Sequence, residues 1–168
     1  MKLKLTLLLI LVIGCGSVLF SQDSIRELEE VIWTIVEKRN STWKDNDFKG
    51  HSELCHPDFM RWISDSDEFL TINNLREFWD SSKKDIKILK LDVKRKAIQF
   101  FNQENLAVAH YEIYEEIEYT GEDYKEENYE IKKGEKFKEI WRFSDYYVKE
   151  GAVWLYVGGN KLEMLKNN

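Results

Sequence analysis

One carboxylate in the sequence stands among aromatic residues in a way that suggests proton-transfer chemistry. Glu139 lies two residues after Phe137 and two before Trp141, and residues two apart share a face of a β-strand. Burial among rings disfavours a charged carboxylate and raises its pKa, which tunes such a group to act as a general acid or base. The alternative is that Glu139 lies near the rim of the sheet or pairs with a lysine, and then it has no catalytic role.

A second set of polar residues falls on one side of two neighbouring predicted strands: His110, Glu112 and Arg142. Such a trio forms a charge network on an exposed face or at a dimer interface more often than a catalytic centre. His110 nevertheless stays, with Glu139, a candidate proton-transfer group beside Tyr111.

A short segment brings together side chains that bind metals in other proteins: His51, Cys55, His56 and Asp58. Their spacing matches no zinc-binding pattern, and Pro57 breaks any helix between them, so we expect no metal site. The sequence also has no glycine-rich phosphate loop, no CxxC motif and no Ser-His-Asp order. These absences predict that no cofactor is bound.

The overall composition limits the classes of partner. The 168 residues include 25 Lys and Arg against 31 Asp and Glu, for a formal net charge of −6. This balance argues against nucleic acid, because a nucleic-acid binder needs a basic face to displace counterions from phosphates. Aromatic residues make up 14% of the chain, with six Trp, and they indicate either a heavy core or a cavity walled by rings.

The N-terminal segment is typical of an export signal. Lys2 and Lys4 precede a mostly apolar stretch over residues 5–13, which is short for a membrane span. We therefore expect residues 1–22 to be a signal peptide and residues 23–168 to form a single domain.

Two processing sites compete at the end of this signal. Cleavage near Ser21 leaves a soluble periplasmic or secreted protein. The alternative is a lipoprotein, because Val12-Ile13-Gly14-Cys15 resembles a bacterial lipobox. Only lipidation at Cys15 would make the membrane a partner.

Helices come first in the chain and long strands follow. Ser24 and Glu27 form a capping box, and Ile25, Leu28 and Ile32 begin an apolar stripe at helical spacing. Beyond it, period-two alternation and turn signals predict strands over residues 59–63, 69–72, 86–101, 106–119, 135–148 and 152–157. This segregation predicts an α+β domain with its helices laid on one face of a bent antiparallel sheet.

Strand alternation sorts the aromatic residues by face. If the last turn centres on Glu150 and Gly151, one side carries Trp141, Trp154, Tyr156 and Asn160. The preceding hairpin places Tyr111 with Ala107 and Ala109, and it places His110 with Arg95 on the other side. We hypothesise that the side of Trp141, Tyr156 and Tyr111 is concave, because small alanines among bulky rings leave room. The candidate pocket-lining residues are Trp43, Trp62, Tyr111, Glu139, Trp141 and Tyr156.

Several short segments resemble the nuclear-transport-factor-2-like superfamily, and within it the SnoaL-like domains of exported bacterial proteins. They are Trp43–Phe48, His56–Phe59, Asn105–Ala109 and Lys149–Trp154. The resemblance implies a cone-shaped fold, the cystatin-like roll, in which N-terminal helices close one end of a strongly curved sheet around a pocket. The superfamily includes ketosteroid isomerase, scytalone dehydratase, polyketide cyclases and ligand-binding or dimerising modules, so it does not fix the chemistry.

Two functions of different class remain. The first is an exported binding module that holds a small apolar or aromatic molecule and forms a homodimer, with Ile140, Leu155 and Val157 covered by the second copy. The second is a cofactor-free isomerase, dehydratase or cyclase that uses a pocket carboxylate or histidine for proton transfer. Whether the chain is an enzyme stays open at this level.

Overall fold

The computed structural model describes residues 24–63, 67–126 and 129–167. The predicted signal segment and Cys15 lie outside these residues. Within the described ranges, no helix has the length and apolar character needed to cross a membrane.

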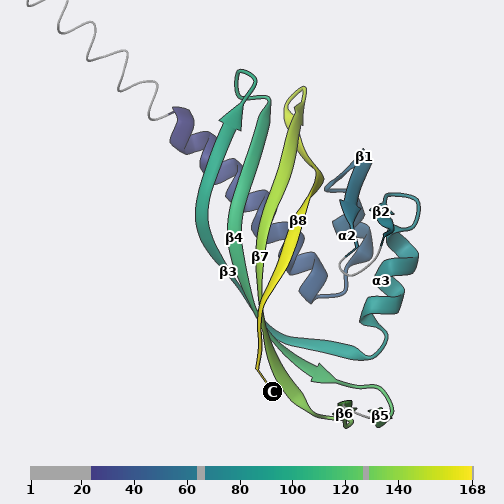
Figure 1. Cartoon of the computed structure of the whole chain (residues 1–168). Helices are drawn as coiled ribbons and strands as arrows, with labels where there is room; N and C mark the ends of the chain where they lie inside the picture. The colour runs from purple at the N-terminus through teal and green to yellow at the C-terminus, as the bar shows by residue number, and fades with distance from the viewer. Residues whose placement is uncertain (1–23, 64–66, 127–128, 168) are drawn as a thin grey trace, which may run out of the picture.

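An N-terminal helix covers residues 24–44, as the apolar stripe predicts. Its buried residues include Ile32, Trp33 and Val36, which join the main hydrophobic core. The helix runs along one face of the large sheet (Figure 1). Arg95 of the sheet also reaches Glu30 and Glu37 of the helix, with N–O distances of 3.0 and 2.7 Å.

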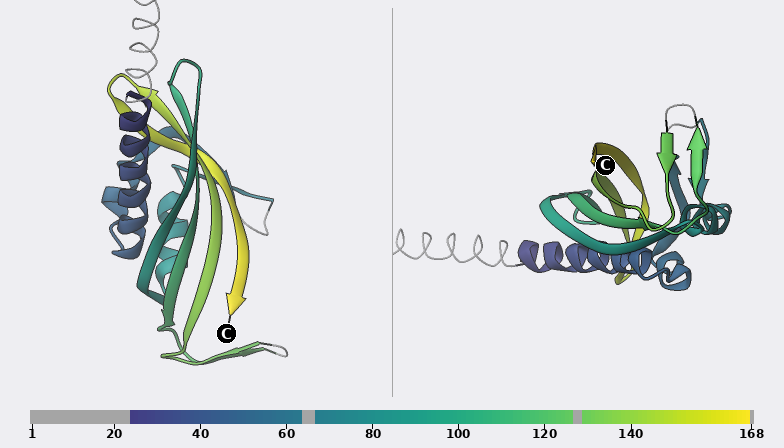
Figure 2. Two further views of the ribbon diagram at one scale, coloured as in Figure 1. Left: turned by 90° about the vertical axis from the view of Figure 1, so that its left-hand side faces the viewer. Right: turned by 90° about the horizontal axis from the view of Figure 1, so that it is seen from below.

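A six-stranded sheet forms the body of the domain, in the order β2-β1-β8-β7-β4-β3. Its strands are β1 (Cys55–Trp62), β2 (Phe69–Thr71), β3 (Ile86–Phe101), β4 (Leu106–Tyr119), β7 (Lys136–Glu150) and β8 (Val153–Asn167). Neighbouring strands are antiparallel except β1 and β8, which are parallel. The long strands curve together, and Figure 2 shows this curvature from two further sides.

The remaining elements are short. Helix α2 (Phe48–Ser52) follows the N-terminal helix, and helix α3 (Leu75–Lys83) links β2 to β3. Strands β5 (Tyr124–Glu126) and β6 (Tyr129–Ile131) form a separate two-stranded sheet in the acidic segment between β4 and β7. The predicted α+β architecture, with helices packed on a strongly curved sheet, is confirmed, although the pairing of β1 with β8 makes the sheet mixed.

Strand β8 differs from the prediction because of a bulge at Gly158. Tyr147 pairs with Tyr156, but Tyr146 pairs with Gly158, so the register shifts by one residue. Gly158 has a φ of +151°, and a Cβ atom there would stand 2.2 Å from the carbonyl oxygen of Met60 on β1. Only glycine allows β1 this close, and the strand continues beyond Gly158 to Asn167 instead of ending at Val157.

The bulges also change which residues face the helices. Beyond Gly158, Asn160 pairs with Ser144 and Lys161 pairs with Phe143. The prediction that Asn160 shares the face of Trp141 was therefore wrong, and Lys161 occupies that face. A second shift, between Arg95 and Ala97, turns Arg95 toward the helix side, again opposite to the prediction.

Candidate functional site

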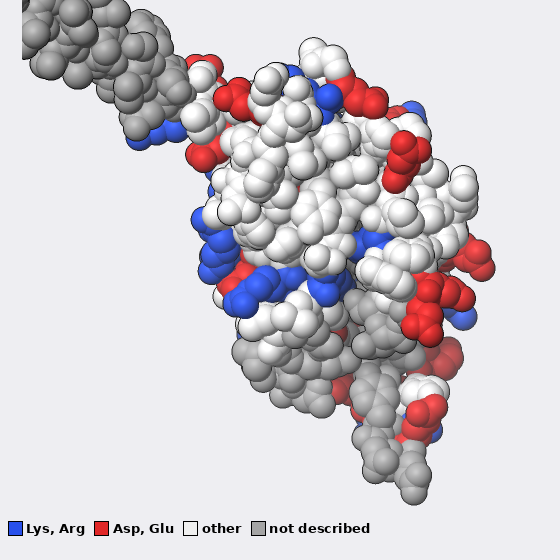
Figure 3. Space-filling view, turned by 45° about the horizontal axis from the view of Figure 1, so that its top comes forward, with Lys and Arg blue, Asp and Glu red and all other residues white. Residues whose placement is uncertain are grey.

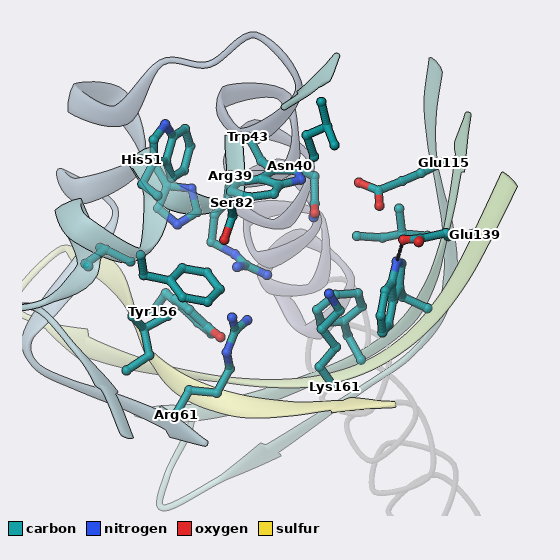
Figure 4. Close-up of a pocket in the computed structure, with 18 of the residues that line it drawn as sticks. Arg39, Asn40, Trp43, His51, Arg61, Ser82, Glu115, Glu139, Tyr156 and Lys161 are labelled. Atoms are coloured by element: carbon teal, nitrogen blue, oxygen red, sulfur yellow. Dashed lines mark hydrogen bonds between the residues drawn. The ribbon is translucent and has the colours of Figure 1, made fainter. Parts of the chain in front are cut away.

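A cavity of about 230 Å³ lies between the sheet and the helices. Figure 4 shows the sheet curving beneath and beside the side chains that line it. Most of the wall is apolar, with rings and branched chains from β1, β2, α3, β4 and β7: Phe59, Leu70, Leu75, Phe78, Trp79, Ile113 and Phe143. The polar lining groups gather in two regions, one near the N-terminal helix and β1, and one on β4, β7 and β8.

The structure brings four of the six sequence-selected residues to this cavity: Trp43, Glu139, Trp141 and Tyr156. Tyr111 is only 1% exposed and does not line this cavity, but its hydroxyl contacts a residue that does. Trp62 lies outside, 54% exposed, with its ring centroid 3.9 Å from that of Phe69. Alternation along β1 explains this placement, since Phe59 and Arg61 face inward and Trp62 therefore faces out.

A buried ion pair supports the inner end of the cavity. The Arg39 guanidinium contacts Asp145 and the Tyr111 hydroxyl, and Tyr111 also donates to Asp145. Arg39 and Asp145 are 5% and 0% exposed. Tyr156 donates to the other oxygen of Asp145 at 3.3 Å, and its ring centroid lies 4.1 Å from the Arg39 Cζ atom. The network therefore holds the lining groups Arg39 and Tyr156 in fixed positions.

Burial sets the protonation states in this network. Burial alone would lower the pKa of Arg39, but Asp145 and Tyr111 offset this and raise it overall. Burial also raises the pKa of Tyr111, and it raises that of Tyr156 to about 12. At neutral pH the network therefore contains a cationic arginine and neutral phenols.

His51 is a cavity residue whose ring is held neutral. Its pKa falls to about 3, first because of burial and then because of the nearby Arg39 cation. The Thr42 hydroxyl donates to the Arg39 carbonyl at 2.7 Å and lies 3.2 Å from His51 Nδ1. Since the single hydroxyl hydrogen is already used, Nδ1 must be the protonated nitrogen. The unprotonated Nε2 is therefore available as a proton acceptor.

A pair of carboxylates marks the other polar region. Glu115 and Glu139 are cross-strand partners on β4 and β7. Burial raises the pKa of Glu115, with Glu139 adding to the rise, while Lys161, Lys83 and a hydrogen bond from Trp43 oppose it. Trp141 Nε1 donates to Glu139 at 2.9 Å (Figure 4), so the predicted neighbour of Glu139 is its hydrogen-bond partner.

Lysine cations complete this region. Lys161 Nζ lies 3.3 Å from the centroid of the Trp141 ring, a cation–π contact. Lys83 Nζ lies 4.0 Å from the centroid of Trp43, and burial lowers its pKa to about 8. The carboxylates are therefore placed among cations and indole donors.

Other predicted candidates lie away from the cavity. His110 is on the outer face of the sheet, where Nδ1 lies 2.9 Å from the Ser144 hydroxyl. It does not line the cavity between sheet and helices, but it lines a second pocket on the outer face with Glu112 and Arg142. Glu112 and Arg142 form the expected charge contact on that face, at 3.0 Å. The alternation of β4 explains this, because Tyr111 faces inward and its even-numbered neighbours face out.

The side chains of the segment considered for metal binding, residues 51–58, have other surroundings. His56 contacts Glu150 at 2.8 Å, and Cys55 is buried, which raises the pKa of its thiol to about 11. In the part of the chain that the structure describes, no three His, Cys, Asp or Glu side chains gather closely enough to hold a metal ion.

No protein-family model matches the sequence, and no curated protein matches it. Solved structures do match. A candidate scytalone dehydratase from Novosphingobium aromaticivorans aligns with a TM-score of 0.67 at 12% identity, covering 87% of this chain and 90% of that chain. A ketosteroid isomerase-like protein from Erwinia carotovora atroseptica has a TM-score of 0.66 at 9% identity, covering 81% and 95%. An NTF2-like protein from Cytophaga hutchinsonii has a TM-score of 0.58 at 16% identity, covering 81% and 98%.

These identities are too low to carry a reaction from one protein to another, so the similarity establishes the fold and leaves the chemistry to the residues of the site. The order of helices, the curved sheet and the cavity between them agree with this similarity. The chain therefore has the nuclear-transport-factor-2-like fold, as its short sequence segments predicted.

Proposed function

We propose that this chain binds a small, largely apolar organic molecule in the cavity between sheet and helices. The observation that carries the proposal is an apolar cavity of about 230 Å³ with polar groups gathered in two regions. Such a cavity, mostly apolar with a few placed polar groups, is typical of small-molecule sites. The buried Arg39–Asp145 pair supports the proposal further. Apolar side chains of similar volume would often stabilise the fold as well as a buried ion pair does, so stability alone does not require this polar inner wall.

Two serines of helix α3 allow a matched test. Ser82 lines the cavity, whereas its neighbour Ser81 is exposed and does not. Replacing Ser82 with Trp fills the cavity, and replacing Ser81 with Trp adds the same side chain at the surface. Binding of 2-naphthamide, a neutral bicyclic probe, is followed by tryptophan fluorescence and by calorimetry. We expect Ser82→Trp to weaken binding at least tenfold and Ser81→Trp to leave it unchanged. Equal affinity in both variants would remove the cavity as the binding site.

A second candidate function, proton-transfer catalysis without a cofactor, rests on His51. Its neutral imidazole lines the cavity, with Nδ1 3.2 Å from the Thr42 hydroxyl. The burial and the Arg39 cation that lower its pKa also make this imidazole a weak base, so it is suited only to a C–H group made acidic by a neighbouring carbonyl. Glu115, whose raised pKa favours the protonated form, would supply an acid in the other polar region.

This second candidate is tested without knowing the substrate. The ketone 2-tetralone exchanges its α-protons for deuterium in D₂O, and NMR measures the rate with wild-type protein and with His51→Asn. We expect wild-type protein to accelerate the exchange and the variant to lose the acceleration. If the two proteins act alike, His51 is not a base and the binding function stands alone.

We also propose that the mature protein is exported and forms a homodimer through the outer face of the sheet. Figure 3 shows a broad part of the surface with few charged side chains above a band of Lys and Arg. On the outer face, Tyr146 and Leu162 are 36% and 59% exposed, which gives a second copy apolar surface to cover. Native mass spectrometry of protein from its own host tests dimer, signal cleavage and lipidation together, and an uncleaved monomer would contradict the proposal.

A further inference from the structure

Arg61 of β1 is a cation that the cavity leaves without an anion. It lines the cavity and is half-buried, and its Nε atom is buried with no hydrogen-bond partner. No ion pair joins it to any carboxylate in the described ranges, whereas the neighbouring Arg39 contacts Asp145 directly. A buried donor without a partner costs free energy, and a positive charge beside it increases that cost.

Among the residues that the structure describes, none forms an ion pair with Arg61. Arg61 acts on His51 and on Tyr156, lowering the pKa of each, so all three lie in one neighbourhood with Arg39. His51 is neutral, and the charge of Asp145 is already matched by Arg39. Counted over the described residues, this region of the cavity therefore carries one more positive charge than negative charges.

The two carboxylates that line the cavity lie on strands that do not neighbour β1: Glu139 on β7, two spacings or roughly 10 Å away, and Glu115 on β4. Glu115 lies on β4, which is separated from β1 by β8 and β7. Three strand spacings of about 4.8 Å each place these backbones roughly 14 Å apart. Figure 4 shows Glu115 and Glu139 to the right of the cavity and Arg61 with Tyr156 to the lower left. The two acids thus lie beside Lys161 and apart from Arg61.

We propose that the molecule bound in this cavity is an aromatic carboxylate whose acid group binds the Arg61 guanidinium. The inference rests on the proposed binding function and names the ligand class for it. A planar guanidinium binds a carboxylate with two parallel hydrogen bonds, and the Nε atom is one of the donors that such a pair uses. The ligand ring then lies against Phe59 and Trp79 of the apolar wall.

The charge count favours a carboxylate over a phosphate. One unpaired arginine balances one negative charge, whereas a phosphate monoester carries up to two charges at neutral pH. A second unmatched charge in a half-buried site would cost more than Arg61 returns.

The test compares two probes of nearly the same shape, 2-naphthoate and 2-naphthamide, by calorimetry on the full mature chain. We expect wild-type protein to bind the carboxylate about tenfold more tightly than the amide, since a charge-assisted pair replaces a neutral one. Arg61→Gln should weaken naphthoate binding at least tenfold and leave naphthamide binding unchanged. Arg61→Lys keeps the charge but not the planar guanidinium, so its affinity for naphthoate should lie between those of wild-type protein and Arg61→Gln.

Arg142→Gln is the matched control, because Arg142 lies on the outer face and pairs with Glu112. It should bind both probes as wild-type protein does. If Arg61→Gln keeps the preference for naphthoate, or if wild-type protein shows no preference, the carboxylate proposal is overturned while cavity binding stands. If neither probe binds to wild-type protein, both proposals fail.

Discussion

Replacing Asp145 with Asn should destabilise the fold by leaving Arg39 as an unpaired buried cation. The carboxylate accepts hydrogen bonds from Arg39, Tyr111 and Tyr156, and it has no solvent exposure. Asparagine has nearly the same shape, so packing changes little. It has one oxygen in place of two, and because Tyr111 and Tyr156 donate to different oxygens of Asp145, the substitution removes the charge and one phenol acceptor. The loss of folding stability therefore measures the polar interactions of Asp145 rather than its packing.

The size of the effect follows from the burial of Arg39, which is 5% exposed. Removing one partner of a buried ion pair costs about 3–5 kcal/mol, because the remaining charge has lost both its water and its counter-ion. A domain of ordinary stability unfolds with about 5–15 kcal/mol. Asp145→Asn should therefore remove a large fraction of the stability, and the midpoint of urea unfolding should fall strongly.

A double variant separates charge from packing. Replacing Arg39 with Met in the Asp145→Asn background removes the orphaned cation and keeps a long apolar side chain against Tyr156. We expect the double variant to recover most of the lost free energy, since a buried ion pair and a well-packed apolar replacement are often of similar stability. Urea unfolding, followed by tryptophan fluorescence, measures all three proteins.

A surface pair provides the comparison. Arg142 and Glu112 are 3.0 Å apart, and the Arg142 side chain is 54% exposed, so Arg142→Gln should change the unfolding free energy by less than about 1 kcal/mol. The reasoning is refuted if Asp145→Asn costs no more than this control. It is also refuted if the double variant is less stable than Asp145→Asn, because the cation would then not be the cause.

Two further predictions concern His51 and Gly158. Because the folded pKa of His51 is about 3 against 6.5 for the free side chain, its stabilising effect is present above pH 6.5 and is lost as the pH falls toward 3. Between pH 7 and pH 4, wild-type protein should lose about 3 kcal/mol more than His51→Asn in unfolding free energy, and equal losses in urea titrations would contradict this. Gly158→Ala should cost at least about 2 kcal/mol and expose β1 amides to hydrogen exchange, because its Cβ would meet Met60. Gly151→Ala, also at positive φ (+61°) but in open space, is the control and should cost less.

The element order was predictable because local signals agree with the global fold. The apolar stripe of the N-terminal helix, the hairpin at residues 102–105 and the change of period near residue 86 all match elements of the structure. Strand alternation also placed Trp141 and Tyr156 on one face, where both line the cavity. Period-two alternation needs no knowledge of the rest of the chain, which is why it succeeds within a regular strand.

The same rule fails beyond a bulge. Gly158 shifts the register because β1 approaches it, and that approach joins segments far apart in the sequence. The contribution of Lys161 to the cavity therefore depends on a non-local contact that alternation does not include. Gly158 and Gly159 together indicate a bend in the strand. They do not indicate that the strand continues beyond them, or that odd-numbered residues such as Lys161 then face the helices in place of even-numbered ones.

Several polar cavity residues had signals in the sequence that chemistry-based motifs do not capture. Arg39 falls on the apolar stripe of the N-terminal helix, seven residues after Ile32 and three after Val36, and Asp145 follows Phe143 on the inner face of its strand. A charge at an apolar position implies a buried partner of opposite sign, because an unpaired one would unfold the domain. The two charges could have been matched to each other by this reasoning alone.

Arg61 extends that argument to function. It shares the inward face of β1 with Phe59, so by the same logic it too requires an anion, yet the described residues offer none within ion-pair distance. Arg39 has Asp145 as its counter-ion, whereas Arg61 has no counter-ion among the described residues. A ligand carboxylate can contribute to Arg61 what Asp145 contributes to Arg39, whereas a neutral ligand would desolvate the Arg61 charge without balancing it. Selectivity for an acid therefore follows from an unmatched charge on an inward-facing strand position.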